Sequence, residues 1–206
     1  MSVRSSRLQR ELEFSSTEIR DLAVAWAVMA AAFAIFFGRP ERLLASVDFA
    51  LLLFAVSAIT VGTGFLLHEL AHKVVAVRFG QIAEFRANYG MLFVAIMSAF
   101  IGFIIAAPGA VHHRGRITQR EHGLVALAGP VTNLALVVVF APFLLFGGLL
   151  GLIGVFGVMV NAFLAAFNMI PLGPLDGKTV WQWSRPVFVV TFAIAVVTTV
   201  VSFMFI

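Results

Sequence analysis

The chain has 206 residues, of which 61% are hydrophobic and 12% are charged, and its formal net charge is +4. A soluble domain carries about 25% charged residues, so this composition excludes a water-facing globular fold or a disordered chain and indicates an integral membrane protein. The basic residues form no run that would indicate nucleic-acid binding, and the absence of cysteine excludes disulfides and thiolate metal ligands.

A polar lead-in at residues 1–21 comes first, and six apolar runs follow it. The lead-in lacks the short basic start of a secretory signal, which argues against a cleaved signal peptide. A membrane-spanning helix needs about 20 apolar residues, and all the runs except 91–107 meet this length, the first one together with its flanking residues. The runs are 22–38, 49–72, 91–107, 123–147, 151–170 and 187–206.

The distribution of Lys and Arg distinguishes six membrane crossings from five. If 91–107 crosses, seven of the 14 basic residues lie on each side; if it does not, 12 lie on one side and only Arg39 and Arg42 lie on the other. The positive-inside rule favours the asymmetric arrangement. We therefore predict an α-helical polytopic membrane protein of five to six transmembrane helices, with five preferred and the N-terminus in the cytosol. In the five-helix arrangement the segment 91–107 is re-entrant or strand-like, and it must be covered by protein or lined by water.

The second apolar run ends in an H-E-x-x-H motif at 68–72. His68 and His72 are four residues apart, so on a helix both project from one face and two imidazole nitrogens can bind one Zn²⁺. Glu69 is turned by about 100° around the helix, which keeps it out of the ligand set but close enough to polarise a metal-bound water. The motif could instead be a polar patch at the membrane surface, but ionisable side chains inside a span usually face a partner or a cavity.

A catalytic zinc takes three protein ligands, so a further residue must complete the site. Asp176 follows the fifth run in a segment whose prolines and glycines interrupt the helix and could aim a carboxylate back into the protein. Five crossings place it on the same face as His72, whereas six place the two on opposite faces. Asp176 could alternatively cap the next helix. His112, His113 and His122 compete as ligands, although adjacent histidines in a basic segment are more often solvated.

Three motifs together resemble the site-2 protease family of intramembrane zinc metalloproteases, which are M50-like peptidases. They are H-E-L-A-H at 68–72, A-G-P-x-x-N at 128–133 and N-x-x-P-x-x-P-L-D-G at 168–177, and the resemblance covers about 58–182. It implies a small membrane-associated β-segment near 84–113 and an active site toward the cytosolic leaflet.

For individual residues, the resemblance implies that His68, His72 and Asp176 bind one zinc per chain and that Glu69 is the general base. It implies Asn168 as a polar group beside the metal that supports the substrate or the oxyanion. Asn133, in the second motif, could either serve close helix packing or support the site.

We therefore predict a single transmembrane metalloprotease domain at 22–206, with its catalytic core at about 49–182, in a multi-pass protein of the cell membrane. It would hydrolyse peptide bonds within or near transmembrane segments of membrane-protein substrates. Its expected partners are the substrate and the lipid bilayer, with no nucleic acid. The segment 91–113 could pair with an unwound substrate by β-strand addition.

Two other classes of function remain open at this point. The same His-His-Asp cluster could serve a non-catalytic metal-binding scaffold or an ion transporter, although a transporter would typically show repeated halves, which are absent here. A membrane-anchored peptidase with soluble substrates is a further alternative. The sequence leaves the substrate, the cleavage position and the oligomeric state undetermined.

Overall fold

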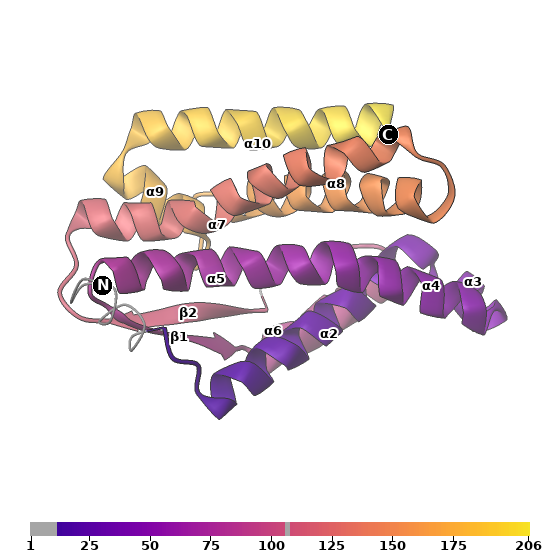
Figure 1. The fold of residues 1–206 in the computed structure, drawn as a ribbon, viewed down its shortest axis with the longest axis horizontal. Helices are drawn as coiled ribbons and strands as arrows, with labels where there is room; N and C mark the ends of the chain where they lie inside the picture. Colours follow the sequence, from indigo (N-terminus) through magenta and orange to yellow (C-terminus); the bar gives the residue numbers. More distant parts are fainter. Residues whose placement is uncertain (1–11, 106–107) are drawn as a thin grey trace, which may run out of the picture.

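The structure is a computed structural model that describes residues 12–105 and 108–206. It is a bundle of helices with one small sheet (Figure 1). Residues 1–11 of the predicted polar lead-in lie outside the described residues, and the first described helix begins within the lead-in, at Ser16. The elements are α2 (Ser16–Gly38), α3 (Pro40–Ala45), α4 (Val47–Ser57), the π-helix η1 (Ala58–Gly62), α5 (Thr63–Arg78), β1 (Ile82–Ala87), α6 (Tyr89–Phe100), β2 (Gly109–Arg114), α7 (Gln119–Phe140), the 3₁₀-helix η2 (Ala141–Leu145), α8 (Gly148–Asn168), α9 (Asp176–Trp183) and α10 (Arg185–Phe205).

Five helical segments of the described chain are long and apolar enough to cross a membrane, which confirms the predicted fold class. They are α2, the continuous α4–η1–α5, α7 with η2, α8 and α10. Figure 1 shows α5, α7, α8 and α10 running roughly parallel to one another, with α2 below α5 and inclined to it. The strands lie alongside the part of α5 that approaches Arg78, and α9 lies at the same end of the bundle. The protein is therefore an α-helical membrane protein with its sheet and α9 at the same end of the bundle.

The segment 91–107 returns to the side from which it starts. Strands β1 and β2 pair antiparallel, with Ala87 opposite Gly109, so the chain between them leaves the sheet and comes back to the same place. Helix α6, which occupies most of this excursion, has 12 residues and is too short to span a bilayer. The register thus supports the five-crossing path over the six-crossing one.

The strand-like interpretation of 91–107 was wrong for the greater part of that segment. Residues up to Phe100 form α6, whose first turn is capped by the Asn88 side chain, which accepts a hydrogen bond from the Met91 backbone N–H at 3.0 Å. The expected β-segment is present, but as two strands on either side of this helix. A short apolar run has no periodicity that separates helix from strand, and the cap residue is what favours the helix here.

Helix α2 fixes the sheet against the bundle through two carboxylates. Glu18 accepts a hydrogen bond from the Phe85 N–H at 3.0 Å, and Asp21 accepts one from the Ala87 N–H at 3.2 Å. These two backbone groups therefore point toward α2 and away from β2. The outer edge of β1 is thus occupied by side chains of α2, which prevents another strand from adding there.

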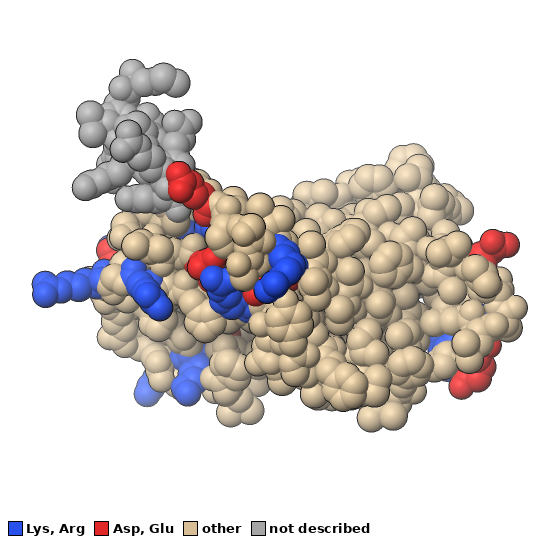
Figure 2. Space-filling view, turned by 90° about the horizontal axis from the view of Figure 1, so that it is seen from below, with Lys and Arg blue, Asp and Glu red and all other residues tan. Residues whose placement is uncertain are grey.

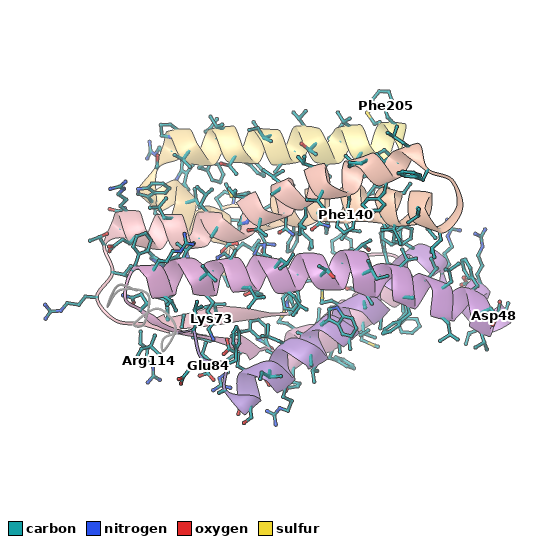
Figure 3. All side chains as sticks on the ribbon, viewed as in Figure 1. Asp48, Lys73, Glu84, Arg114, Phe140 and Phe205 are labelled. Carbon is teal, nitrogen blue, oxygen red and sulfur yellow. The ribbon has the colours of Figure 1, made fainter. Side chains whose placement is uncertain are left out.

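The same Glu18 forms a buried ion pair with Lys73 of α5. Its second oxygen lies 2.6 Å from the Lys73 ammonium, and both side chains are 1% exposed. Lys73 also donates to the Glu13 carbonyl oxygen at 2.9 Å and lies over the ring of Phe14. Figure 3 shows Lys73 beside the strands. Glu18 therefore connects the sheet to the helix that carries the H-E-x-x-H motif.

We expect Glu18→Ala to lower the free energy of unfolding by about 3–5 kcal/mol, because it leaves a buried ammonium without its counter-ion. The measurement is denaturant-induced unfolding of the protein in detergent. Glu84→Ala is the matched control, since Glu84 pairs with Arg86 at 3.0 Å where both side chains are at least one third exposed. That surface pair should contribute no more than about 1 kcal/mol. An equal loss of unfolding free energy in the two variants would contradict the proposed connection of the sheet to α5 through Glu18.

Candidate metal centre

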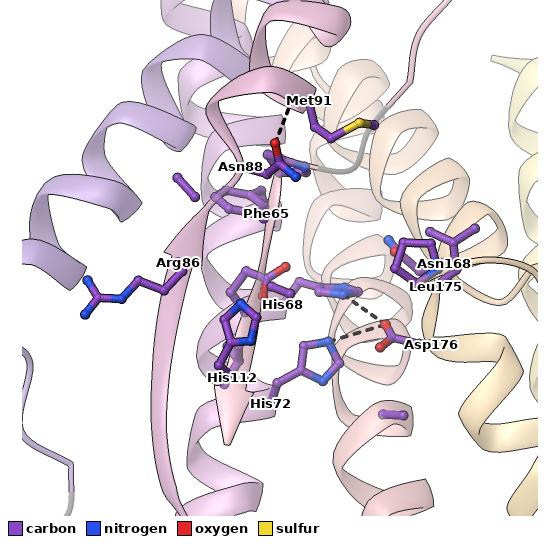
Figure 4. A pocket seen from close by; sticks show the side chains of 18 of the residues that line it. Phe65, His68, His72, Arg86, Asn88, Met91, His112, Asn168, Leu175 and Asp176 are labelled. Atoms are coloured by element: carbon purple, nitrogen blue, oxygen red, sulfur yellow. Dashed lines mark hydrogen bonds and ion pairs between the residues drawn. The ribbon is translucent and has the colours of Figure 1, made fainter. Parts of the chain in front are cut away.

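Three side chains from two distant parts of the chain converge at one point. The Oδ2 atom of Asp176, the first residue of α9, lies 3.2 Å from His68 Nε2 and 3.3 Å from His72 Nε2. In the described part of the chain, these are the only three His, Asp or Glu residues whose ligand atoms all lie within 4.8 Å of one another. Figure 4 shows both imidazoles directed at the carboxylate. The structure thus brings together the three residues that the sequence suggested as ligands.

Hydrogen bonds on the far side of each ring determine which nitrogen faces the cluster. His72 Nδ1 lies 2.7 Å from the carbonyl oxygen of Val125, and a carbonyl can only accept, so this nitrogen carries the hydrogen. His68 Nδ1 lies 2.5 Å from Oδ1 of Asn133. Both rings are consequently held with Nε2 toward Asp176, the orientation that metal-binding histidines commonly have.

The three converging atoms fit a single zinc ion. Asp176 Oδ2 is buried and has no hydrogen-bond partner among the described residues. With each Nδ1 carrying the ring hydrogen, three acceptor atoms face one another, and such a group is favourable only with a proton or a metal cation between its members. Tetrahedral zinc with bonds of about 2.0–2.1 Å separates its ligand atoms by roughly 3.3 Å, close to the distances found here. Two imidazoles and one carboxylate form a ligand set typical of catalytic zinc, and they leave a fourth position open.

Positive charge at the cluster favours the ionised carboxylate of Asp176, the form that binds a metal. Burial by itself would raise its pKa, but charge on the facing imidazoles of His72 and His68, when they are protonated, lowers the pKa to about 2. Asp176 does not act as the helix cap that the sequence left as an alternative. Leu175 occupies the N-cap position of α9, and its side chain makes no capping hydrogen bond.

Two glycines let the backbone come close enough to form this cluster. A Cβ atom on Gly129 of α7 would lie 2.5 Å from His68 Nε2 and from His72 Nε2, so only glycine fits against the two rings. A Cβ atom on Gly177 would overlap the backbone of Met169, where α8 ends. These contacts give a physical reason for the glycine in each of the second and third sequence motifs.

Glu69 and Asn168 line the same cavity as the cluster. This cavity has a volume of about 720 Å³, and β2 forms one wall while the end of α8 and the start of α9 form the other (Figure 4). The Oε2 atom of Glu69 is buried without a hydrogen-bond partner in the described chain. The Nδ2 group of Asn168 donates to the carbonyl oxygen of Leu164 at 3.0 Å, one turn back on α8. Their positions are compatible with the roles expected of them, which remain predictions.

The competing histidines lie elsewhere on the cavity wall. His112 and His113 are on β2 and His122 is on α7, and none of them belongs to the three-residue group. The rings of His113 and His122 contact edge to face, with centroids 5.3 Å apart. Burial, followed by the neighbouring His122 and His112, lowers the pKa of His113 below its ordinary value of 6.5. The geometry therefore favours Asp176 over these histidines as the third ligand.

Comparison with known proteins agrees with a zinc site. The chain is 43% identical over 176 residues to a protein of Methanocaldococcus jannaschii named "Putative zinc metalloprotease MJ0611", an alignment that covers 83% of this chain and 86% of that protein. It is 32% identical over 140 residues to "Putative zinc metalloprotease YwhC" of Bacillus subtilis, covering 58% of this chain and 64% of that protein. No family model and no solved structure matches the chain.

We expect Gly129→Ala to remove most of the bound zinc, because the added methyl group would displace both imidazoles. The measurement is zinc content per chain of protein purified in detergent without chelators. Gly147→Ala serves as the control, since a Cβ atom there meets nothing within 4 Å. Unchanged zinc content in folded Gly129→Ala would show that α7 does not confine the site.

Proposed function

The chain belongs to the zinc metalloprotease family of its curated relatives, and we propose that it hydrolyses peptide bonds within or near transmembrane segments of membrane-protein substrates. The observation that carries this proposal is the position of the metal centre on a membrane-spanning helix. His68 and His72 lie ten and six residues before Arg78, where α5 ends. At a rise of 1.5 Å per residue they lie about 15 and 9 Å from that end, inside a helical segment long and apolar enough to cross a membrane, which supports a site within the membrane.

His68, His72 and Asp176 would hold the zinc. Zinc, when bound, polarises a substrate carbonyl and lowers the pKa of a coordinated water toward about 7. The Oε2 atom of Glu69 would take the proton of the attacking water and return it to the leaving amine. Its freedom from other hydrogen bonds supports this role. The second N–H of the Asn168 amide would be available to stabilise the oxyanion, since the first donates to Leu164.

An extended substrate segment would bind along β2. Phe85 and Ala87 direct their N–H groups toward α2, so their partners Val111 and Gly109 direct their backbone groups away from β1. These residues line the cavity that contains the metal centre. The free edge of β2 therefore offers backbone hydrogen bonds to a substrate that has unwound from its helix.

We further propose that the end of the bundle with β1, β2 and α9 faces the cytosol of a cell membrane. With five crossings, the described basic residues Arg20, Lys73, Arg78, Arg86, Arg114, Arg116, Arg120, Lys178 and Arg185 belong to this end, and Arg39 and Arg42 belong to the other. Figure 2 shows most Lys and Arg side chains of the face in view toward one end, together with some acidic side chains, and further acidic side chains at the opposite end. The positive-inside rule supports this orientation.

The alternative of a metal-binding scaffold or ion transporter gives no reason for a buried, unpartnered carboxylate at Glu69. Burying such a group without a hydrogen bond is unfavourable, and catalysis supplies a reason to retain it. A scaffold would need only the three ligands.

Glu69→Gln tests the assignment of the general base. We expect the rate of peptide hydrolysis to fall by about 10²–10⁴-fold while zinc content stays the same, because the amide cannot accept the proton but the ligands are intact. Turnover and zinc content are measured on the same preparation, with 1,10-phenanthroline as the control for metal dependence. Glu13→Gln, whose side chain is exposed, should keep full activity. An active Glu69→Gln protein would remove the assignment.

A comparison of substrates tests whether the peptide bond is cleaved inside the membrane. We expect proteoliposomes to cleave a tagged single-span membrane protein, and a soluble peptide of the same sequence to be cleaved at least about tenfold more slowly. Cleavage is followed by mass spectrometry of the products, with Glu69→Gln as the blank. Equal cleavage of both would favour the membrane-anchored peptidase with soluble substrates.

A further inference from the structure

We propose that Asn161, in the middle of α8, is a positioning residue of the metal centre: through Asn133 it determines which ring nitrogen of His68 carries the hydrogen. The inference rests on the zinc site proposed above, but it does not depend on the reaction or the substrate. Asn161 does not contact the cluster, and it lies in an apolar helix where a buried amide needs a reason.

Three buried hydrogen bonds form a series from the Gly157 carbonyl group of α8 to His68, and we call this series the relay. Asn161 Nδ2 donates to the Gly157 carbonyl oxygen at 2.9 Å. Asn161 Oδ1 accepts from Asn133 Nδ2, also at 2.9 Å, and Asn133 Oδ1 faces His68 Nδ1. Both asparagines are 0% exposed, so water cannot replace any of these partners.

The direction of this relay follows from its first member. The Gly157 carbonyl can only accept, so the atom of Asn161 beside it must be the amide nitrogen, and the oxygen must face Asn133. Asn133 must then present its nitrogen to Asn161 and its oxygen to His68. The oxygen can accept only from a protonated Nδ1, which leaves the Nε2 lone pair of His68 for the metal.

Asn133 alone would be held less firmly in this orientation. Its remaining contact is with the Gly64 carbonyl oxygen, to which Nδ2 donates at 3.3 Å, at the long end of the normal range. Without Asn161, the amide can rotate so that Nδ2 faces His68. The ring hydrogen would then move to Nε2, the atom that must bind the metal.

Gly64 provides the space for this relay. A Cβ atom at this position of α5 would overlap Oδ1 of Asn161. The glycine therefore allows α8 to place its amide close to α5, one turn before His68. The relay thus depends on a small residue of the motif-bearing helix itself.

The test is zinc affinity, measured by competition with a chelator of known affinity. We expect Asn161→Leu to weaken zinc binding about 10–100-fold, as loss of a hydrogen-bond partner behind a ligand commonly does. Because Asn161 acts through Asn133, the double variant Asn161→Leu/Asn133→Leu should bind zinc no more weakly than Asn133→Leu alone. Unchanged zinc affinity in Asn161→Leu would overturn the proposal. So would a double variant in which the losses of zinc affinity from the two single variants add.

Two controls separate positioning from folding. Thr191→Val removes a buried hydroxyl from α10, which contributes no residue to the relay, and should leave zinc affinity unchanged. Gly64→Ala raises the helix propensity of α5 and keeps both amides, yet we expect weaker zinc binding because the methyl group displaces Asn161. A Gly64→Ala protein that binds zinc as tightly as wild type would contradict the relay. Absence of proteolysis in a wild-type protein that binds zinc, with affinity still lowered in Asn161→Leu, would instead count against the proposed function and leave the relay standing.

Discussion

Three acceptor atoms, two imidazole nitrogens and one carboxylate oxygen, face one another inside an apolar bundle. This arrangement is unfavourable without a proton or a metal cation between the three atoms. Much of the structure near the centre can be understood from this constraint. Gly129 lets α7 close over the two rings, backbone and amide oxygens hold their Nδ1 atoms, and the irregular segment after α8 brings Asp176 back from the end of the bundle.

One stretch of α5 joins the metal centre to the sheet. His72 belongs to the cluster, and the next residue, Lys73, forms the buried ion pair with Glu18. Glu18 also binds the β1 backbone, so the distance between the cluster and the free edge of β2 is fixed by neighbouring residues of a single helix. A protease that cuts an unwound substrate needs this combination, because the strand that holds the substrate and the ligands that activate the water must keep a constant separation.

The local parts of the site could be predicted from the sequence. The spacing of His68 and His72 fixes their common face on a helix, and the count of basic residues on each side of the membrane correctly favoured a path on which Asp176 meets them. The family resemblance supplied the β-segment between the motifs. The prediction of the ligand face succeeded because it depends on helical periodicity, and the prediction of the path succeeded because it depends on the charges of the segments between crossings.

Apart from the meeting of Asp176 with the two histidines, contacts between distant segments could not be predicted. The strand-like interpretation failed at α6 because a short apolar run carries no signal that separates helix from strand. The fit of Gly129 against two rings depends on how α7 and α5 cross. Asn161 did carry a signal, since an amide in the middle of the apolar run 151–170 requires a partner, but the sequence does not say which one.

Zinc-edge X-ray absorption of the detergent-purified protein, with Asp176→Ala as the comparison, tests whether His68, His72 and Asp176 hold one zinc ion. We expect about one zinc per chain, bound by two imidazoles and further oxygen ligands at about 2.0–2.1 Å, with a carboxylate contribution that is absent from the variant. Three or more imidazoles, or a spectrum that Asp176→Ala leaves unchanged, would contradict this expectation and would return His112, His113 and His122 to the ligand set.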